Sequence, residues 1–394
     1  MRPFSLLPLL GLLTLAPSIH AQSSDASDAQ ARKLLFQSCG AVESQALPSG
    51  VQPGVYRGTL GAQPITLELR SKPGESGGQI QDRYRYDRHG VSIVLERGRP
   101  AGQTATPALL GIESVFHGDG SSARGCLKLT ADGGALRGQW FTPDGTKRLA
   151  VALTTVEVAA VPLALSASPE LTKLRSGDPF TFLALNRAWS KVAGGLKEPL
   201  TGVTYPRVPG GSPALNLALQ DGQIKLVRDA LDCLGGDTNV ENGTDFSAAG
   251  TLSWKSAGLV SLHENVEYYC GGAHPDSYTA GLTLDARSGK TVRLAGKPGT
   301  LWPGLSAQKV QALYVAGYPK NADVSGCVDE VASPEISGEY DNYTLYLDAK
   351  GLTLWPTYLP HVAMACAEAV TVPYARLRAL ADPKSPYFHD LYPR

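Results

Sequence analysis

Residues 126–153 read CLKLTADGGALRGQWFTPDGTKRLAVAL, and this stretch decides the fold of the first half of the chain. It contains three short segments rich in apolar residues, which are separated by Asp132-Gly133-Gly134 and by Pro143-Asp144-Gly145. Aspartate, proline and glycine in such clusters are typical of tight turns, and short strands joined by tight turns pair with their neighbours in an antiparallel manner. The stretch therefore predicts three consecutive antiparallel strands.

The same pattern extends upstream to about residue 50. Residues 54–58 (GVYRG) open it, and residues 65–69 (ITLEL) alternate between apolar and polar with the period of two that a half-buried strand requires. Two further strands are predicted on either side of a turn at residues 87–90. We therefore expect residues 46–158 to form an all-β domain, as an antiparallel meander, a barrel or a sandwich. The run of turn, GQW, turn and strand resembles the small lipocalin-like β domains of some exported bacterial proteins.

The length of the chain indicates how many domains it has, and its charge balance argues against some classes of partner. A length of 394 residues suggests two domains or three. The 36 Lys and Arg residues equal the 36 Asp and Glu residues, so the formal net charge is zero. Nucleic-acid binding usually needs a basic excess, and membrane-surface binding needs a polybasic patch, so we expect neither partner.

The first residues have the features of a secretory signal peptide, predicted over residues 1–21. Arg2 precedes an apolar run at residues 4–15, and Ala21 is the small residue at the expected cleavage site. The run is too short to span a bilayer comfortably, although an uncleaved N-terminal anchor remains the alternative. We expect an exported protein, periplasmic or secreted, with no transmembrane segment in the mature chain. Residues 22–45 are expected to form a flexible leader and a short helix.

Six cysteines are present, and an even number in an exported protein favours disulfides. Six cysteines allow 15 pairings. Pairing in chain order is the one we favour, because it keeps one bridge in the first domain and two in the second. No two cysteines have a CxxC-like spacing, which argues against a metal bound by cysteine. The disulfide candidates are Cys39, Cys126, Cys233, Cys270, Cys327 and Cys366.

The second half of the chain mixes helices and strands. Residues 159–172 are rich in Ala, Ser and Pro, and we expect them to be a linker. Residues 173–394 are expected to form an α+β domain with an antiparallel sheet. Helices are predicted within 214–233 and at 306–316. Strands are predicted at 201–206, 258–263, 266–270, 277–284, 291–294, 343–347, 352–355 and 369–374.

Four ordered segments of this second half carry a family resemblance. They are YYCGGAHP at 268–275, DARSGK at 285–290, the tyrosine-rich strand pair at 343–356, and VTVPYARL at 370–377. Together they resemble the RsiV/PdaC-type bacterial envelope domain family of unknown function, over about 200 residues. The resemblance implies a fold and a theme of binding in the cell envelope. It implies neither the sensing nor the deacetylase activity of the proteins in which this domain type occurs, because those need further segments.

The GGAH segment supplies the candidate binding or turn residues. Consecutive glycines allow a positive φ, and a histidine before Pro275 is held in an extended or turn conformation. The imidazole could bond to backbone at a sharp corner, contact a ligand, or act as a base. The candidates are Tyr268, Tyr269, Gly271, Gly272, His274 and Asp276. The tyrosines Tyr268, Tyr269, Tyr278, Tyr340, Tyr343 and Tyr346 could form either a sheet face in the core or a binding surface.

No catalytic motif is assembled in the sequence. Residues 74–78 match G-x-S-x-G, but a nucleophile elbow leads into a helix, and Pro73 and Gly77-Gly78 argue against one there. The G-K-T at 289–291 has Leu284 where a phosphate-binding loop needs glycine. The histidines are scattered, without the spacing of a zinc hydrolase. We therefore expect no metal and no cofactor, and assign no catalytic residue.

Three functions remain open, and the first is favoured. The chain is expected to be a non-enzymatic binding or accessory module of the bacterial envelope, with a lysozyme-type protein or a cell-wall glycan such as a peptidoglycan fragment as ligand. The first alternative is an envelope hydrolase with a site around His274, which a carboxylate beside His274 or His263 would support. The second is a structural component of an envelope assembly, which a broad exposed apolar patch would support.

Overall fold

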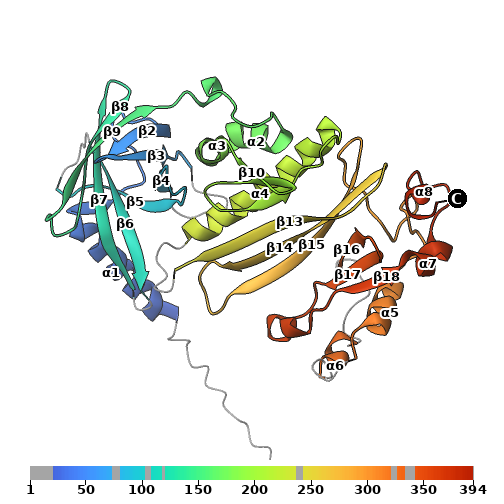
Figure 1. Ribbon diagram of the computed structural model, residues 1–394. Coiled ribbons are helices and arrows are strands. Elements are labelled where there is room, and N and C mark those ends of the chain that lie inside the picture. Colours follow the sequence, from blue (N-terminus) through green and yellow to red (C-terminus); the bar gives the residue numbers. More distant parts are fainter. Residues whose placement is uncertain are drawn as a thin grey trace, which may run out of the picture.

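The computed structural model describes residues 21–72, 80–102, 108–117, 120–236, 243–320, 326–332 and 342–393. The G-x-S-x-G match, Tyr340 and all but the last residue of the predicted signal peptide lie outside these ranges. An all-β region forms one end of the molecule and an α+β region forms the rest (Figure 1), so the predicted fold class is confirmed.

The β region is a closed antiparallel barrel. In the order β5-β4-β3-β2-β9-β8-β7-β6, the last strand pairs with the first, and β1 (Ala41–Glu43) extends the far end of β5. Of the three architectures that the sequence left open, the barrel is therefore the one formed. Its strands are β2 (Gly54–Leu60), β3 (Gln63–Leu69), β4 (Gln81–Tyr86), β5 (Ile93–Pro100), β6 (Ala108–His117), β7 (Gly120–Asp132), β8 (Ala135–Phe141) and β9 (Arg148–Thr155).

Strand β6 was not predicted, and its burial explains why. Leu109 points into the barrel core, whereas Leu110 and Ile112 pack on the outside against the N-terminal helix and a disulfide. A strand that is buried on both faces has no alternation of apolar and polar residues to detect.

A buried carboxyl group lies inside the barrel. Glu113 is 6% exposed and accepts hydrogen bonds from the Tyr84 hydroxyl at 2.6 Å and from the Trp140 indole. Burial raises the pKa of Glu113, and the hydrogen bonds only partly oppose it. The folded state therefore holds a proton on this group at pH values where the unfolded chain has lost it.

Glu113→Gln should raise the free energy of unfolding at pH 7.5 by on the order of 1 kcal/mol, because the amide oxygen can still accept both bonds without a buried charge. Because the pKa of Glu113 is higher in the folded protein than in the unfolded chain, the free energy of unfolding of the wild type falls as the pH rises from the lower pKa through the higher one. The gain should therefore shrink at pH 4, where the wild-type carboxyl is protonated. Urea unfolding at the two pH values tests this, and an equal effect at both would contradict it.

The N-terminal segment corrects a prediction. Helix α1 spans Ala21–Ser38, where a flexible leader followed by a short helix was expected. Its C-terminal turns bury Leu35 and Phe36 against β6 and β7, and Arg32 forms ion pairs with Glu43 and Glu96. This tertiary contact supports a helix that a polar, alanine-rich sequence would not hold by itself.

The predicted linker at 159–172 also needs correction, because helix α2 (Pro169–Gly177) begins inside it. Helix α3 (Pro179–Leu185) follows directly, and Asp178 caps it by accepting a hydrogen bond from Thr181 N at 3.1 Å. Each helix has proline in its first turn. Proline is favoured there because its missing N–H would be unpaired anyway, so these prolines begin helices and do not mark a linker.

The α+β region is built of stacked layers of helices and sheets. Helix α4 (Pro213–Gly236) packs on one face of the central sheet, and a three-stranded sheet packs on the other (Figure 1). Within β14 (Leu259–Tyr269), Val260 and Leu262 face α4, whereas Ser261 accepts a hydrogen bond from Leu347 N of the opposite sheet. The central sheet runs β10 (Ser190–Val192), β11 (Gly195–Lys197), β12 (Thr204–Pro206), β13 (Asp245–Lys255), β14 (Leu259–Tyr269) and β15 (Asp276–Asp285), and the other sheet runs β16 (Tyr343–Asp348), β17 (Gly351–Pro356) and β18 (Val370–Pro373).

Three details of the strand predictions are wrong. The segments 258–263 and 266–270 form one strand, β14, and 291–294 contributes only an isolated bridge between Thr291 and Leu284. The sheet is not wholly antiparallel, because β12 pairs with β13 in parallel. The remaining helices are α5 (Ala307–Gly317), α6 (Cys327–Val331), α7 (Tyr374–Leu377) and α8 (Phe388–Leu391).

All six cysteines form disulfides, with the pairing in chain order that the sequence favoured. The bonds are Cys39–Cys126, Cys233–Cys270 and Cys327–Cys366. Within the described residues, no helix is both long and apolar enough to cross a membrane.

Candidate functional site

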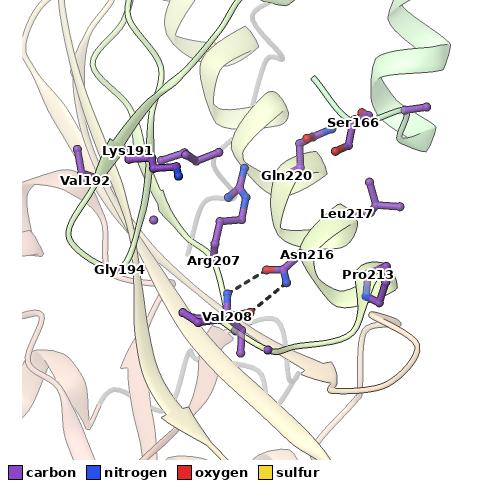
Figure 2. Close-up of a pocket in the computed structure, with 15 residues that line it drawn as sticks. Ser166, Lys191, Val192, Gly194, Arg207, Val208, Pro213, Asn216, Leu217 and Gln220 are labelled. Atoms are coloured by element: carbon purple, nitrogen blue, oxygen red, sulfur yellow. Dashed lines mark hydrogen bonds between the residues drawn. The ribbon is translucent and has the colours of Figure 1, made fainter. Parts of the chain in front are cut away.

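A groove of about 800 Å³ opens beside the N-terminal half of α4. Figure 2 shows its walls, which are the hairpin of β10 and β11, the loop that leaves β12, and α4 itself. Apolar residues line part of it, among them Val192, Leu196 and Leu217. Its polar lining consists of the side chains of Ser166, Lys191, Arg207, Asn216 and Gln220.

The loop wall of the groove is tied to α4. Asn216 accepts a hydrogen bond from Val208 N at 2.9 Å and donates one to Val208 O at 3.1 Å (Figure 2). At the start of α4, the Ser212 hydroxyl accepts a hydrogen bond from Leu215 N at 3.1 Å and donates one to Ala286 O at 2.9 Å. These bonds fix the loop after β12 and the start of α4 relative to each other.

Arg207 carries a positive charge that no carboxylate balances in the described part of the chain. Its guanidinium donates to Pro206 O and to Gln223 Oε1, each at 2.9 Å, and both acceptors are neutral. Gln223 is itself oriented, because its amide nitrogen donates to Leu196 O and Val203 O. Burial lowers the pKa of Arg207 to about 10, so the group stays charged at neutral pH.

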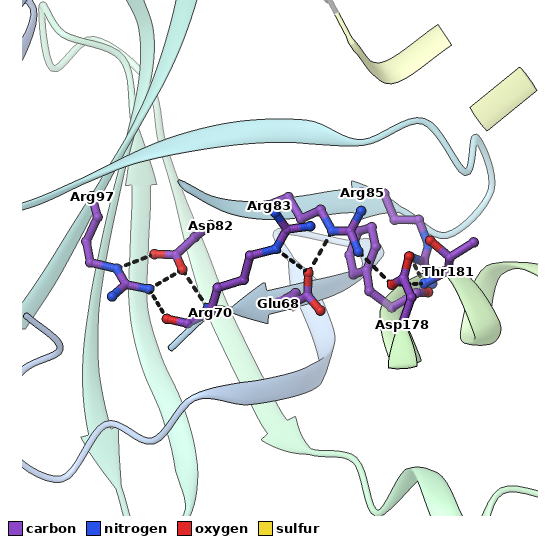
Figure 3. Close-up of polar contacts among 9 residues, drawn as sticks. Glu68, Arg70, Asp82, Arg83, Arg85, Arg97, Asp178 and Thr181 are labelled. Carbon is purple, nitrogen blue, oxygen red and sulfur yellow. Dashed lines mark hydrogen bonds and ion pairs between the residues drawn. The ribbon is translucent and has the colours of Figure 1, made fainter. Parts of the chain in front are cut away.

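A second cleft, of about 940 Å³, lies between the barrel and helices α2 and α4. Its central charges are paired within the protein: Arg83 bridges Glu68 and Asp178, at 2.7 Å to each (Figure 3). Arg70 makes a further ion pair with Glu68 at 2.9 Å. This network joins the barrel to the helices, and it leaves the central guanidinium groups less available to an anion than Arg207 is.

The GGAH residues form the turn between β14 and β15. Gly271 and Gly272 have φ of 99° and 102°, which is the positive φ expected for them. The Tyr269 hydroxyl donates to Gly272 O at 3.0 Å. At the base of the turn, the Tyr268 hydroxyl donates to Asp276 at 3.2 Å. The structure thus brings these candidate residues together at an exposed hairpin tip, and a ligand there remains a prediction.

His361 is the neighbour of this tip that sequence reasoning missed. It begins the 3₁₀ turn His361–Cys366, and its ring stacks on His274 with a centroid distance of 3.6 Å. A ring nitrogen of each histidine lies near Pro275 O, at 3.2 Å for His274 and 2.8 Å for His361. No motif links two histidines so far apart in the chain, so only the fold could reveal the pair.

The other sequence candidates are dispersed. Tyr346 is buried against His263 of the central sheet, and Tyr343 is buried on the opposite face of β16 against Tyr314 of α5. Tyr278 is 39% exposed beside the hairpin tip, so the tyrosines do not share one face. His263 packs against Tyr346, its Nδ1 has no hydrogen-bond partner, and burial lowers its pKa. Among the described residues, neither His263 nor His274 hydrogen-bonds a carboxylate.

Comparison with known proteins yields only distant structural similarity. No model of a protein family matches this chain, and no curated protein is significantly similar to it. A DUF3298 family member from Bacteroides fragilis NCTC 9343 is 14% identical, with a TM-score of 0.33, over 52% of this chain and 92% of its own. A DUF3298 family protein from Pseudomonas aeruginosa PAO1 is 16% identical, with a TM-score of 0.24, over 43% of this chain and 71% of its own. This chain is thus similar to bacterial proteins of the DUF3298 family, at a level that carries no argument about its function, and the RsiV/PdaC-type resemblance stays a prediction.

Proposed function

We propose that this chain is an exported, non-enzymatic binding module of the bacterial envelope, and that the groove beside α4 binds an acidic ligand. The observation that carries the proposal is Arg207, a partly buried guanidinium whose partners are neutral oxygens. These bonds use two of its five N–H donors. A planar guanidinium with free donors is suited to bidentate hydrogen bonds with a carboxylate.

Other features of the groove favour an anion of moderate size. Lys191 adds a second positive charge from the hairpin of β10 and β11, and the N-terminus of α4 adds the positive end of a helix dipole. The volume lies within the range of small-molecule sites, and the apolar lining can contact the uncharged part of a ligand. A carboxylate-bearing peptidoglycan fragment has this combination of charge and size. A concave groove suits such a fragment better than it suits the surface of a lysozyme-type protein.

The proposed location rests on the predicted signal peptide and on the three disulfides. Disulfides persist in oxidising compartments such as the bacterial periplasm and the extracellular space. A periplasmic or secreted module would meet cell-wall fragments there.

Arg207→Gln should weaken the binding of a muropeptide mixture about tenfold or more, because a hydrogen bond to a charged group contributes roughly 1.5–3 kcal/mol. Isothermal titration calorimetry of the oxidised protein measures this, with the melting temperature confirming that the variant folds. Arg207→Lys should recover part of the affinity, since it keeps the charge and loses the planar fork. Arg376→Gln, at an exposed position remote from the groove lining, is the matched control and should bind like the wild type.

Lysozyme as a second titrant separates the two ligand classes. If lysozyme binds and muropeptides do not, the proposal of an acidic fragment is overturned, and a lysozyme-type protein becomes the favoured ligand. Muropeptide binding that Arg207→Gln leaves unchanged would place the ligand elsewhere on the molecule.

A further inference from the structure

We propose that the groove beside α4 binds the peptide part of its acidic ligand, and that one residue of this peptide pairs in β fashion with the free edge of β10. This mode of binding rests on the proposed function, because it specifies which part of a cell-wall fragment is recognised and how. It is supported by an unpaired strand edge that borders the groove.

Strand β10 has a free outer edge. It is the first strand of the six-stranded sheet, and among the described strands it pairs only with β11. Its three residues are all exposed, so none of the described elements covers its outer side. Its central residue, Lys191, also lines the groove (Figure 2). An unpaired strand edge next to a groove is a geometry by which proteins bind peptides as an added strand.

The hydrogen bonds of β11 show which backbone groups of β10 are free. Gly194, just before β11, accepts a hydrogen bond from Arg207 N at 2.9 Å. Glu198, just after β11, donates one to Val203 O at 3.0 Å. Both bonds run toward β12, and successive residues of an antiparallel strand bond to alternate sides. Leu196 lies two residues from Gly194 and from Glu198, and it therefore also bonds toward β12.

Lys191 presents a free donor and a free acceptor at this edge. It lies directly opposite Leu196 in the pairing of β10 with β11. Because Leu196 bonds toward β12, the N–H and C=O of Lys191 point away from β11. No bond to any other element of the described chain involves either group. A single extended residue of a ligand can therefore form two backbone hydrogen bonds here, so a short stem peptide from the cell wall is long enough.

The side chain of Lys191 lies on the groove side of the sheet. Lys191, Leu196 and Tyr205 are opposite one another on three adjacent strands, and such residues share one face. The Tyr205 hydroxyl is so close to Gly222 of α4 that a β-carbon at that position would be 2.6 Å from it, so α4 covers this face. A ligand residue paired with Lys191 has its side chain on the same face, with the two β-carbons about 4.5–5.5 Å apart. An acidic side chain there would meet the Lys191 ammonium group.

The spacing of the strands specifies the class of peptide. Neighbouring strands lie about 4.8 Å apart, so a ligand residue beside β10 is three spacings, or roughly 14 Å, from the line of β12. Arg207 directly follows β12, and its side chain covers only part of that distance. The carboxylate that contacts Arg207 is therefore a different one from the carboxylate beside Lys191. The preferred ligand is an extended peptide with at least two carboxylates.

A second copy of this chain is a poorer occupant of the edge. Three residues make a short edge, and a lysine at its centre is a feature that prevents strand edges from pairing with one another. Two copies paired in an antiparallel manner about Lys191 would place two ammonium groups opposite each other, which is destabilising. The same charge favours an acidic peptide.

Calorimetric titration of the oxidised protein compares three probes: a muropeptide mixture, the stem peptides released from it, and chitotetraose as a glycan without a peptide. Because the peptide makes the contacts, the stem peptides should bind within about tenfold of the muropeptides, and chitotetraose should not bind. Binding of chitotetraose without binding of the stem peptides would overturn the proposal.

Two variants of Lys191 separate the backbone hydrogen bond from the charge. Lys191→Gln removes the charge and keeps the N–H, whereas Lys191→Pro removes both. Proline is tolerated at an edge position whose N–H lies outside the ladder, and the melting temperature checks that the variant folds. Lys191→Pro should bind the stem peptides about three- to tenfold more weakly than Lys191→Gln, which is the effect of one lost hydrogen bond. Equal affinities of the two folded variants would contradict strand pairing.

Amide hydrogen exchange, followed by NMR, gives a second readout on the wild-type protein. The Lys191 amide should exchange rapidly in the free protein and at least about tenfold more slowly with saturating stem peptide. Unchanged exchange at saturation would also contradict strand pairing. Muropeptide binding that depends on Arg207 but not on the Lys191 N–H would leave the proposed function intact and remove strand pairing alone. Absence of muropeptide binding would overturn the proposed function, and strand pairing with it.

Discussion

The double variant Cys39→Ala/Cys126→Ala should lose about 4–5 kcal/mol of unfolding free energy relative to the oxidised wild type. The disulfide joins residues separated by 87 positions, and a cross-link across so long a loop removes much conformational entropy from the unfolded chain. Cys126 is fully buried, and it packs with Leu35 and Phe36 of α1 and with Ile112 of β6. The bond therefore also fixes the N-terminal helix to the barrel. Urea unfolding followed by far-UV circular dichroism measures the loss.

The double variant Cys327→Ala/Cys366→Ala provides the comparison. Its cysteines are separated by 39 positions, so the same entropy argument predicts a loss smaller by roughly 0.5–1 kcal/mol. A reversed order of the two variants would contradict the argument from loop length. A loss below about 1 kcal/mol for Cys39→Ala/Cys126→Ala would show that α1 and the barrel hold together without the bond.

Phe180→Ala should destabilise the protein by about 3–5 kcal/mol, the cost of truncating a fully buried phenylalanine. Phe180 is 1% exposed and lies where α3 meets the outside of the barrel. The guanidinium carbons of Arg83 and Arg85 lie 4.4 Å and 4.1 Å from the centre of its ring. Thermal unfolding and urea titration of the variant measure the effect.

Arg85 explains why this ring is difficult to replace. Its side chain is fully buried, and Nε and Nη2 have no hydrogen-bond partner, although Nη1 donates to Phe180 O at 2.8 Å. Burial lowers the pKa of Arg85 to about 9, and the nearest carboxylate oxygen, on Asp87, is 3.9 Å away. The negative face of the aromatic ring therefore supplies part of the electrostatic stabilisation that this cation lacks.

Phe180→Leu is the control for volume, since it keeps a large apolar side chain and removes the ring. If the ring face matters, this variant should still lose about 1 kcal/mol or more. A Phe180→Leu variant as stable as the wild type would show that apolar volume alone is needed. A loss below about 1.5 kcal/mol for Phe180→Ala would mean that the contact between barrel and helices relaxes around the cavity.

The sequence by itself was sufficient for features that depend on local patterns. Alternation at residues 65–69 and the turns at Asp132-Gly133-Gly134 and Pro143-Asp144-Gly145 predicted strands that the barrel contains. Chain-order pairing of the cysteines was also correct, because each pair lies within one structural region. The consecutive glycines at 271 and 272 adopt the positive φ expected of them. Periodicity, turn residues and backbone freedom act over a few residues, so a linear reading can detect them.

Tertiary structure decided the closure of the barrel, the length of the N-terminal helix and the character of the proposed site. Strand β6 lacked a local signal because it is buried on both faces, and for helix α1 only a short helix was predicted, because its contacts with the barrel are distant in sequence. Arg207 is one of many arginines in the sequence, and only the fold shows that its partners are neutral. His274 and His361 are far apart in the chain, and only packing of the 3₁₀ turn against the hairpin tip brings their rings together. Burial, charge compensation and convergence of side chains depend on contacts distant in sequence, which no local pattern encodes.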